Sequence, residues 1–123
     1  MIVELSRTFR FEAAHRLTGV PPDHKCARLH GHSFKVDVVV RGPMDPATGW
    51  LMDFGDLKRV VQPLIDRLDH QYLNEIDGLE NPTSEVLAGW LWERIEPLLP
   101  GLLAAITVHE TCNAHCTYRG ERA

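Results

Sequence analysis

The sequence lacks a long apolar run, a surplus of positive charge and an even set of cysteines, and each lack excludes a class of protein. No apolar run approaches the roughly 20 residues of a membrane-spanning helix, so we expect no membrane partner. The formal net charge is −4, which argues against nucleic acid as a partner, because such binding depends on a basic surface. Residues 1–4 carry no charged leader and the three cysteines are an odd number, so we expect free thiols in the cytoplasm.

What the chain does contain is enough apolar material for a core and an unusual number of histidines. Its 123 residues are 44% hydrophobic, and we expect them to form a single domain over residues 1–123. Seven histidines are many for this length. That surplus indicates metal or proton chemistry.

The hydrophobic pattern predicts an α+β fold. Strands are expected where apolar residues alternate or cluster, at 3–13, 33–41, 50–52, 104–110 and 117–119. Apolar spacings of three and four predict two amphipathic helices. Asp53 caps the first, which Pro63 should bend or interrupt, and Asn81 caps the second, with Pro82 at its first position. The order ββααββ indicates an antiparallel sheet with both helices packed on one face.

A four-stranded sheet of this kind has two free edges. Exposed edges offer unpaired backbone groups, and proteins usually cover or pair them. We therefore expect the chain to form a homo-oligomer through its sheet edges.

His30 and His32 lie two residues apart at the start of the second predicted strand, so both imidazoles face the same way. His15 ends the first strand on its apolar face and can complete a triangle if the strands pair as a hairpin. Three histidines without a fourth protein ligand are typical of catalytic zinc, which keeps one position open. The alternative is that these residues lie on the surface or form a satisfied core pair.

Cys26 lies among Lys25, Arg28 and the expected metal. Nearby positive charge lowers the pKa of a thiol from about 8.5 and favours the reactive thiolate. Two alternatives remain open at this point. Cys26 can be an inert buried residue, or a fourth ligand that closes a structural zinc site.

Acidic residues provide two weaker signals. Asp69 precedes His70 directly, and a carboxylate next to an imidazole can orient it for acid–base catalysis. Glu110 shares the apolar face of the last long strand, where a carboxylate is costly unless it is paired. It can accept hydrogen bonds from a ligand or form a structural salt bridge. Cys112 and Cys116 are interpreted as ordinary thiols.

These residues resemble the 6-pyruvoyl-tetrahydropterin synthase superfamily. The resemblance covers nearly the whole chain in the family's order, through Phe11-Glu12-Ala13-Ala14-His15-Arg16-Leu17, Cys26-x-Arg28-Leu29-His30-Gly31-His32, Leu68-Asp69-His70, Asn81-Pro82-Thr83-Ser84-Glu85 and Glu110-Thr111. The short spacing from Cys26 to His30 and the ending at 116–121 resemble its bacterial branch, the 6-carboxy-5,6,7,8-tetrahydropterin synthases of queuosine biosynthesis.

The resemblance implies a tunnelling fold, in which sheets from several subunits join into a barrel, as a trimer or a hexamer of two stacked trimers. It implies one Zn²⁺ per subunit on the three histidines. It also implies active sites between subunits, where Cys26 can meet the Asp69–His70 pair across an interface.

The reaction implied by the resemblance converts 7,8-dihydroneopterin triphosphate to 6-carboxy-5,6,7,8-tetrahydropterin, acetaldehyde and triphosphate. Cys26 would abstract a side-chain proton, and His70, oriented by Asp69, would relay it. Glu110 would bind the pterin ring. The substrate-binding residues would also include Thr83 and Ser84 at the pterin and Arg16, Lys25 and Arg28 at the triphosphate.

Other functions remain open from the sequence. The chain can perform the pyruvoyl reaction, which eliminates triphosphate and keeps all three side-chain carbons. It can also be a non-catalytic module stabilised by zinc. A general zinc hydrolase is disfavoured, because no glutamate stands beside the histidines as it does in His-Glu-x-x-His.

Overall fold

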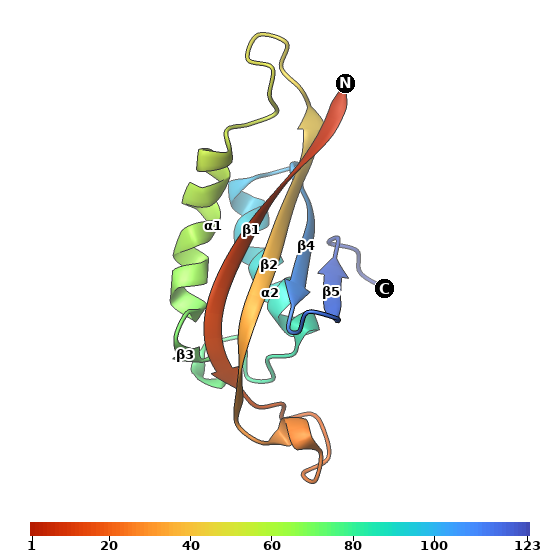
Figure 1. Ribbon diagram of the computed structural model, residues 1–123. Coiled ribbons are helices and arrows are strands. Elements are labelled where there is room, and N and C mark those ends of the chain that lie inside the picture. The colour runs from red at the N-terminus through yellow and green to blue at the C-terminus, as the bar shows by residue number, and fades with distance from the viewer.

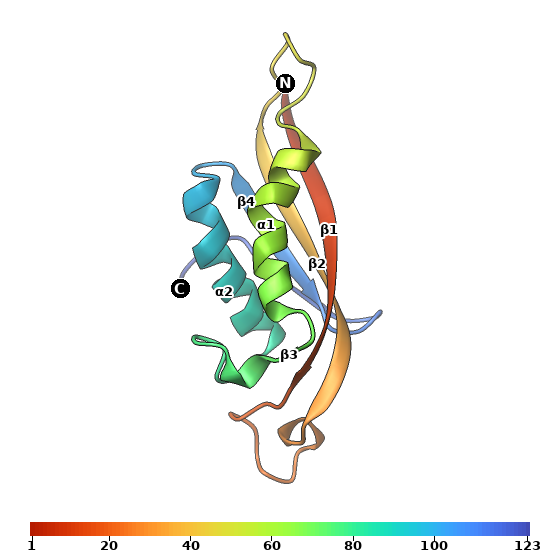
Figure 2. The ribbon, with the colours of Figure 1, turned by 90° about the vertical axis from the view of Figure 1, so that its left-hand side faces the viewer.

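The computed structural model describes residues 1–123 and contains one sheet with two helices on one of its faces (Figures 1 and 2). The elements in chain order are β1 (Ile2–His15), β2 (His30–Pro43), α1 (Phe54–Leu68), β3 (Gln71–Tyr72), α2 (Ser84–Ile95), β4 (Leu103–His109) and β5 (His115–Tyr118). Short 3₁₀ helices occupy Lys25–Ala27, Leu73–Glu75 and Glu96–Leu98. This arrangement confirms the α+β class.

The sheet has the strand order β3-β1-β2-β4-β5. All neighbouring strands are antiparallel except β3, which is parallel to β1 over two residues. The hairpin of β1 and β2 is the longest pairing, and its register is unbroken from Ile2 opposite Pro43 to His15 opposite His30. Because opposed residues share a face, this register places the ends of the two strands and their histidines together.

The core lies between the sheet and the two helices. Alternate residues of β1 and β2 point into it, and Phe11 stacks on its partner Phe34 with ring centroids 4.9 Å apart. The helices contribute aliphatic side chains such as Leu57 and Leu91, which are fully buried. The opposite face of the sheet is polar, as the alternation in β1 predicts.

The first helix begins where the sequence predicts. Asp53 caps it, because its Oδ1 accepts a hydrogen bond from the backbone N–H of Gly55 at 2.8 Å. The helix runs unbroken through Pro63, so the predicted interruption is wrong. Pro63 is exposed, and the buried residues Val61 and Ile65 on the other side keep the helix against the sheet despite the lost hydrogen bond.

The second helix begins later than predicted. Thr83 caps it by accepting a hydrogen bond from Val86 N–H at 3.0 Å, so the predicted cap at Asn81 and first position at Pro82 are wrong. The side chain of Asn81 accepts a hydrogen bond from Thr18 N–H instead, and Pro82 is buried. Both residues therefore serve long-range contacts that local spacing does not reveal.

The predicted strand at residues 50–52 is also wrong. Residues 50–52 form only one isolated bridge, between Trp50 and Asp45, because the preceding turn leads directly to the cap of α1. The third strand in chain order is instead Gln71–Tyr72, which makes a five-stranded sheet with β3 and β5 at its edges. Neither helix has the length and apolar character required to cross a bilayer.

Candidate metal centre and adjoining pockets

Three histidines converge at the end of the β1–β2 hairpin. His15 is the last residue of β1, and His30 and His32 are the first and third residues of β2. Their ring centroids are 4.6 to 5.1 Å apart, and one ligand nitrogen from each lies within 4.8 Å of the others. His15 is completely buried. The group can therefore present three imidazole nitrogens to a single ion.

Backbone carbonyls determine which ring nitrogens are free. Nδ1 of His15 lies 2.8 Å from the carbonyl oxygen of Pro82, and Nδ1 of His30 lies 2.7 Å from that of Arg28. A carbonyl only accepts, so each Nδ1 carries the proton and each Nε2 keeps its lone pair. This is the tautomer that binds a metal through Nε2.

Two of these nitrogens are buried without a partner. Nε2 of His15 and Nε2 of His32 make no hydrogen bond, and a buried polar atom of this kind is costly unless something binds it. Burial lowers the pKa of His15, which favours the neutral imidazole that a metal requires. The histidines thus fit a divalent metal that accepts nitrogen ligands, such as zinc.

Cys26 lies in the 3₁₀ helix that precedes β2 and is half-buried. Its backbone carbonyl accepts a hydrogen bond from Leu17 N–H at 2.8 Å, and its N–H donates to His24. The sulfur is not part of the three-histidine group. The group therefore consists of three imidazoles without the thiol.

Glu110 follows β4 immediately and faces the histidines. Its Oε1 lies 3.7 Å from Nε2 of His15. It also lines a pocket of about 400 Å³ together with Ser84, Glu85 and Thr111. The sequence-predicted residues Glu110 and Ser84 therefore share one pocket beside the triad. Thr83 does not line it, since its hydroxyl caps α2.

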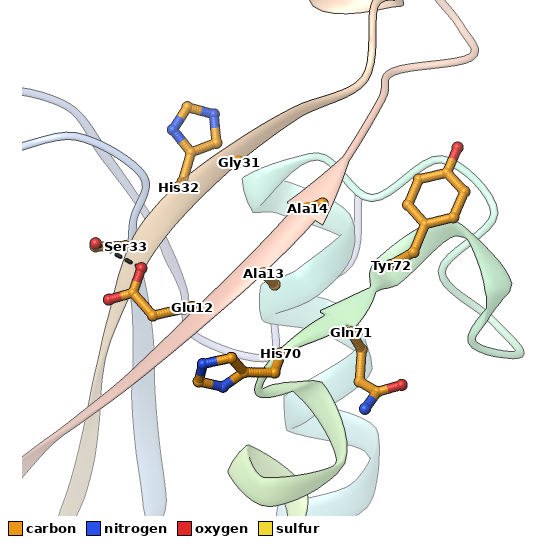
Figure 3. Close-up of a pocket in the computed structure, with 9 residues that line it drawn as sticks. All are labelled: Glu12, Ala13, Ala14, Gly31, His32, Ser33, His70, Gln71 and Tyr72. Carbon is orange, nitrogen blue, oxygen red and sulfur yellow. Dashed lines mark hydrogen bonds between the residues drawn. The ribbon is translucent and has the colours of Figure 1, made fainter.

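Asp69 and His70 lie at the edge of the sheet beside β1, and His70 lines the same pocket as one ligand of the triad, His32. Both approach β1 at Glu12, whose N–H donates to Asp69 Oδ1 at 2.9 Å and whose carbonyl accepts from His70 N–H. His70 lines a pocket of about 540 Å³ with Glu12 and Ser33, which are hydrogen bonded to each other (Figure 3). Side chains alternate along a strand, so the side chains of Glu12 and Ser33 lie on the face of the hairpin opposite to that of the three histidines.

The Asp69–His70 pair is held in a defined geometry. His70 Nδ1 lies 2.9 Å from Asp69 Oδ2, and the His70 side chain is 76% exposed. The Glu12 N–H, followed by the His70 ring, holds the pKa of the Asp69 carboxyl below its ordinary value. His70 has a positive φ of 58°, a left-handed conformation that histidine tolerates better than most residues. The pair is therefore held in one geometry by contacts within the chain.

The three predicted phosphate ligands Arg16, Lys25 and Arg28 are exposed and have no carboxylate partner within 4.0 Å. None lines the pocket at His70 or those at Glu110. Sequence reasoning also missed the carbonyl of Pro82, and no local signal identifies a contact 67 residues from its partner.

Comparison with known proteins identifies the family of this chain. The profile of the family described as 6-pyruvoyl tetrahydropterin synthase matches residues 4–121. The chain belongs to that family. Its sequence is 44% identical over 124 residues to 6-carboxy-5,6,7,8-tetrahydropterin synthase of Synechocystis sp., covering 94% of this chain and 92% of the relative. It is 35% identical over 133 residues to human 6-pyruvoyl tetrahydrobiopterin synthase, covering 96% and 92%.

The structures of the synthase family agree with the fold. Caenorhabditis elegans 6-pyruvoyl tetrahydropterin synthase superposes with a TM-score of 0.89 at 29% identity, covering 98% of this chain and 97% of that one. The expected tunnelling fold of the subunit is therefore confirmed. The chain is an enzyme of the synthase family, and the alternative of a non-catalytic zinc module is set aside.

Proposed function

We propose that this enzyme is a zinc-dependent carbon–carbon lyase of queuosine biosynthesis. It would convert 7,8-dihydroneopterin triphosphate to 6-carboxy-5,6,7,8-tetrahydropterin, acetaldehyde and triphosphate. The observation that carries the proposal is the convergence of three imidazoles with buried, unpartnered Nε2 atoms next to a pocket that contains Glu110. The similarity to the Synechocystis 6-carboxytetrahydropterin synthase supports this choice of product.

Zinc bound by His15, His30 and His32 would supply a Lewis acid for oxygen atoms of the substrate side chain. Pro82 and Arg28 keep the first two imidazoles in the ligating tautomer through their carbonyls. The burial of His15 keeps bulk water from its ring. These contacts hold the imidazoles of His15 and His30 in one orientation.

The pterin ring would occupy the pocket beside the triad. The Glu110 carboxylate can accept two hydrogen bonds from the adjacent amino and ring N–H groups of a pterin. Ser84, which follows Thr83 at the start of α2, lines the same pocket and would provide a further contact. Glu110 has no hydrogen bond within the chain, so its oxygens are available to a ligand. The 3.7 Å contact with His15 gives way to the ligand when the site is loaded.

Proton transfer requires a base, and Cys26 is positioned on the segment that leads into the ligand strand β2. A thiolate there would abstract a proton from the substrate side chain. His70, oriented by Asp69, would relay it. The redox change is internal to the substrate, so this scheme needs no nicotinamide or flavin.

The Asp69–His70 pair would act on a neighbouring subunit. Within one chain His70 lines a pocket with Glu12, Ser33 and His32, and its ring is largely exposed. The sheet edges at β3 and β5 are unpaired, and a homo-oligomer joined at these edges, as a hexamer of two stacked trimers, would bring His70 of one copy to Cys26 of the next.

The pyruvoyl reaction is the second candidate, and the 35% identity to the human pyruvoyl enzyme favours it. Both reactions release triphosphate from the same substrate. Only the carboxy reaction cleaves a carbon–carbon bond and releases acetaldehyde.

The deciding experiment incubates zinc-loaded protein with 7,8-dihydroneopterin triphosphate and measures acetaldehyde and pterin products. We expect acetaldehyde and 6-carboxytetrahydropterin in equal amounts, with neither formed by the His32→Ala variant. Triphosphate release without acetaldehyde would assign the pyruvoyl reaction instead. No triphosphate release by folded, zinc-loaded protein would refute both.

A further inference from the structure

Four basic side chains form one row across the polar face of the sheet. The strand registers place Arg10 opposite Lys35, Lys35 opposite His109, and His109 opposite His115. Opposed residues share a face, so the four side chains, which we name the basic row, run side by side across β1, β2, β4 and β5. The next row along the strands is different, since it consists of Thr8, Asp37, Thr107 and Thr117.

Two members of the basic row, Arg10 and Lys35, have no ion-pair partner within the chain, whereas His109 is paired with Asp37. Like charges directly opposite each other destabilise a sheet, yet Arg10 faces Lys35. Neither has a carboxylate within 4.0 Å. The nearest acidic residue along β2, Asp37, is already engaged, because Thr8 hydrogen bonds one oxygen at 2.6 Å and His109 contacts the other at 2.9 Å. The opposition of Arg10 and Lys35 costs stability and has no carboxylate partner within the chain, which indicates an external anion at these two side chains.

A pocket of about 450 Å³ lies over the row. Arg10, Lys35 and His109 line it with the hydroxyl-bearing residues Ser33 and Thr111. Cys112 and the carboxyl group of Glu110 also lie at its boundary, but that carboxyl group lies toward the triad, 3.7 Å from His15 Nε2. Guanidinium, ammonium and hydroxyl groups are the side chains that bind phosphate oxygens.

The pocket adjoins the one that contains His70. Ser33 lines both, and Glu12 and Ser33 are paired on the row next to Arg10 and Lys35. Residues two apart on a strand are separated by about 7 Å. In the proposed oligomer a substrate side chain that reaches His70 of one subunit therefore lies one row from the cations of that subunit.

We propose that Arg10, Lys35 and His109 bind the triphosphate group of a substrate whose pterin is held by the neighbouring subunit. The inference rests on the proposed function for the placement of the substrate, whereas the affinity of the row for a linear triphosphate does not depend on turnover. The residues differ from Arg16, Lys25 and Arg28, the phosphate ligands expected from the sequence. Each subunit then supplies the acid–base pair and the phosphate site for its neighbour.

The first test measures binding of inorganic triphosphate to the zinc-loaded oligomer by calorimetry, with zinc content determined afterwards. We expect Arg10→Gln and Lys35→Gln each to weaken binding about tenfold or more. Arg41→Gln is the matched control, because Arg41 lies on the same face at the far end of β2. Unchanged binding in the two row variants, or an equal loss in Arg41→Gln, would overturn the proposal.

The second test separates the substrate from the released product. Competitive inhibition of the wild-type enzyme by inorganic triphosphate, with a KM raised about tenfold and kcat within twofold in Lys35→Gln, would support the substrate subsite. Non-competitive inhibition, or a lowered kcat at unchanged KM, would overturn it. If the enzyme releases no triphosphate but the row variants lose affinity, the proposed function fails while the anion site stands.

Discussion

The imidazole of His15 is hydrogen bonded through Nδ1 to the carbonyl oxygen of Pro82, 2.8 Å away. This contact joins the end of β1 to the segment that leads into α2. It also leaves Nε2 of His15 deprotonated and directed at the space shared with the other two imidazoles. The tautomer of the His15 imidazole is thus determined by Pro82, a residue that does not itself bind metal.

Removal of one ligand should abolish tight metal binding. In His32→Ala we expect the zinc affinity to fall by more than the 10- to 100-fold that loss of an outer-shell partner costs, roughly 100-fold or more. Competition with a chromogenic chelator measures this. His115→Ala is the matched control, since it removes a histidine that is not one of the three converging imidazoles. Stoichiometric zinc retained by His32→Ala would contradict the assignment.

Loss of the thiol should abolish turnover and spare the metal. We expect Cys26→Ala to keep its zinc and its thermal stability while kcat falls by about 10²- to 10⁴-fold, the usual contribution of a general base. Cys112→Ala, which removes an exposed thiol, should behave as wild type. Loss of zinc in Cys26→Ala would show instead that the sulfur is a ligand.

Two inactive variants should restore each other. In the proposed oligomer Cys26 of one subunit acts together with His70 of the next, so a Cys26→Ala subunit next to a His70→Ala subunit forms one site with both groups intact. We expect partial activity after the two proteins are dissociated and reassembled together, and none when each is reassembled alone. Absence of activity in mixed oligomers of confirmed composition would place the pair outside the active site.

The Asp37 carboxylate should make stability depend on pH. Burial raises its pKa, but hydrogen bonds from Thr8 and His109 outweigh this, so the folded pKa lies below the unfolded value of about 3.9. A depressed carboxyl pKa stabilises the fold above pH 4, and this contribution is lost as the pH falls through the folded pKa.

In Asp37→Asn we expect about 1.5–3 kcal/mol less stability at pH 7, the usual value of hydrogen bonds to a charged group. The difference from wild type should shrink toward zero below pH 3. Urea unfolding at pH 7, 4.5 and 3 provides the comparison. A constant difference at all three pH values would show that the effect is not ionic.

Phe34 connects the core to the metal centre. It is 1% exposed, stacks on Phe11, and lies 5.5 Å from the rings of both His15 and His32. We expect Phe34→Ala to cost about 3–5 kcal/mol of unfolding free energy, because it leaves a large cavity, and to weaken zinc binding. Phe54→Ala, at a half-exposed position, should cost less than about 1 kcal/mol, and equal losses in the two variants would contradict this account.

Periodic patterns predicted the parts of the fold that depend on them. The alternation from Val3 to Ala13 identified β1, and the apolar spacing after Asp53 identified α1, because burial on one face imposes a period. The two-residue strand β3 carries no such pattern, since its pairing to β1 depends on the turn at Asp69 and His70. Its position was therefore not predictable from spacing.

The candidate site likewise contains residues that the sequence predicts and residues that it does not. A histidine pair two apart on a strand and a third on its neighbour are visible in the sequence, and the structure brings these rings together. The carbonyl of Pro82 and the basic row depend on tertiary contacts and on strand register, which local sequence does not specify. The roles of Cys26, Asp69 and Glu110 stay predictions until the variants are measured.

The unbroken register of the β1–β2 hairpin limits how this sequence can change. One residue inserted or deleted between Phe11 and His15 would turn His15 onto the solvent-facing side, whereas the loop at residues 16–29 can vary in length without moving either strand. Homologous genes should therefore carry their length differences in that loop, and a gap inside either strand would mark a protein that has lost its metal.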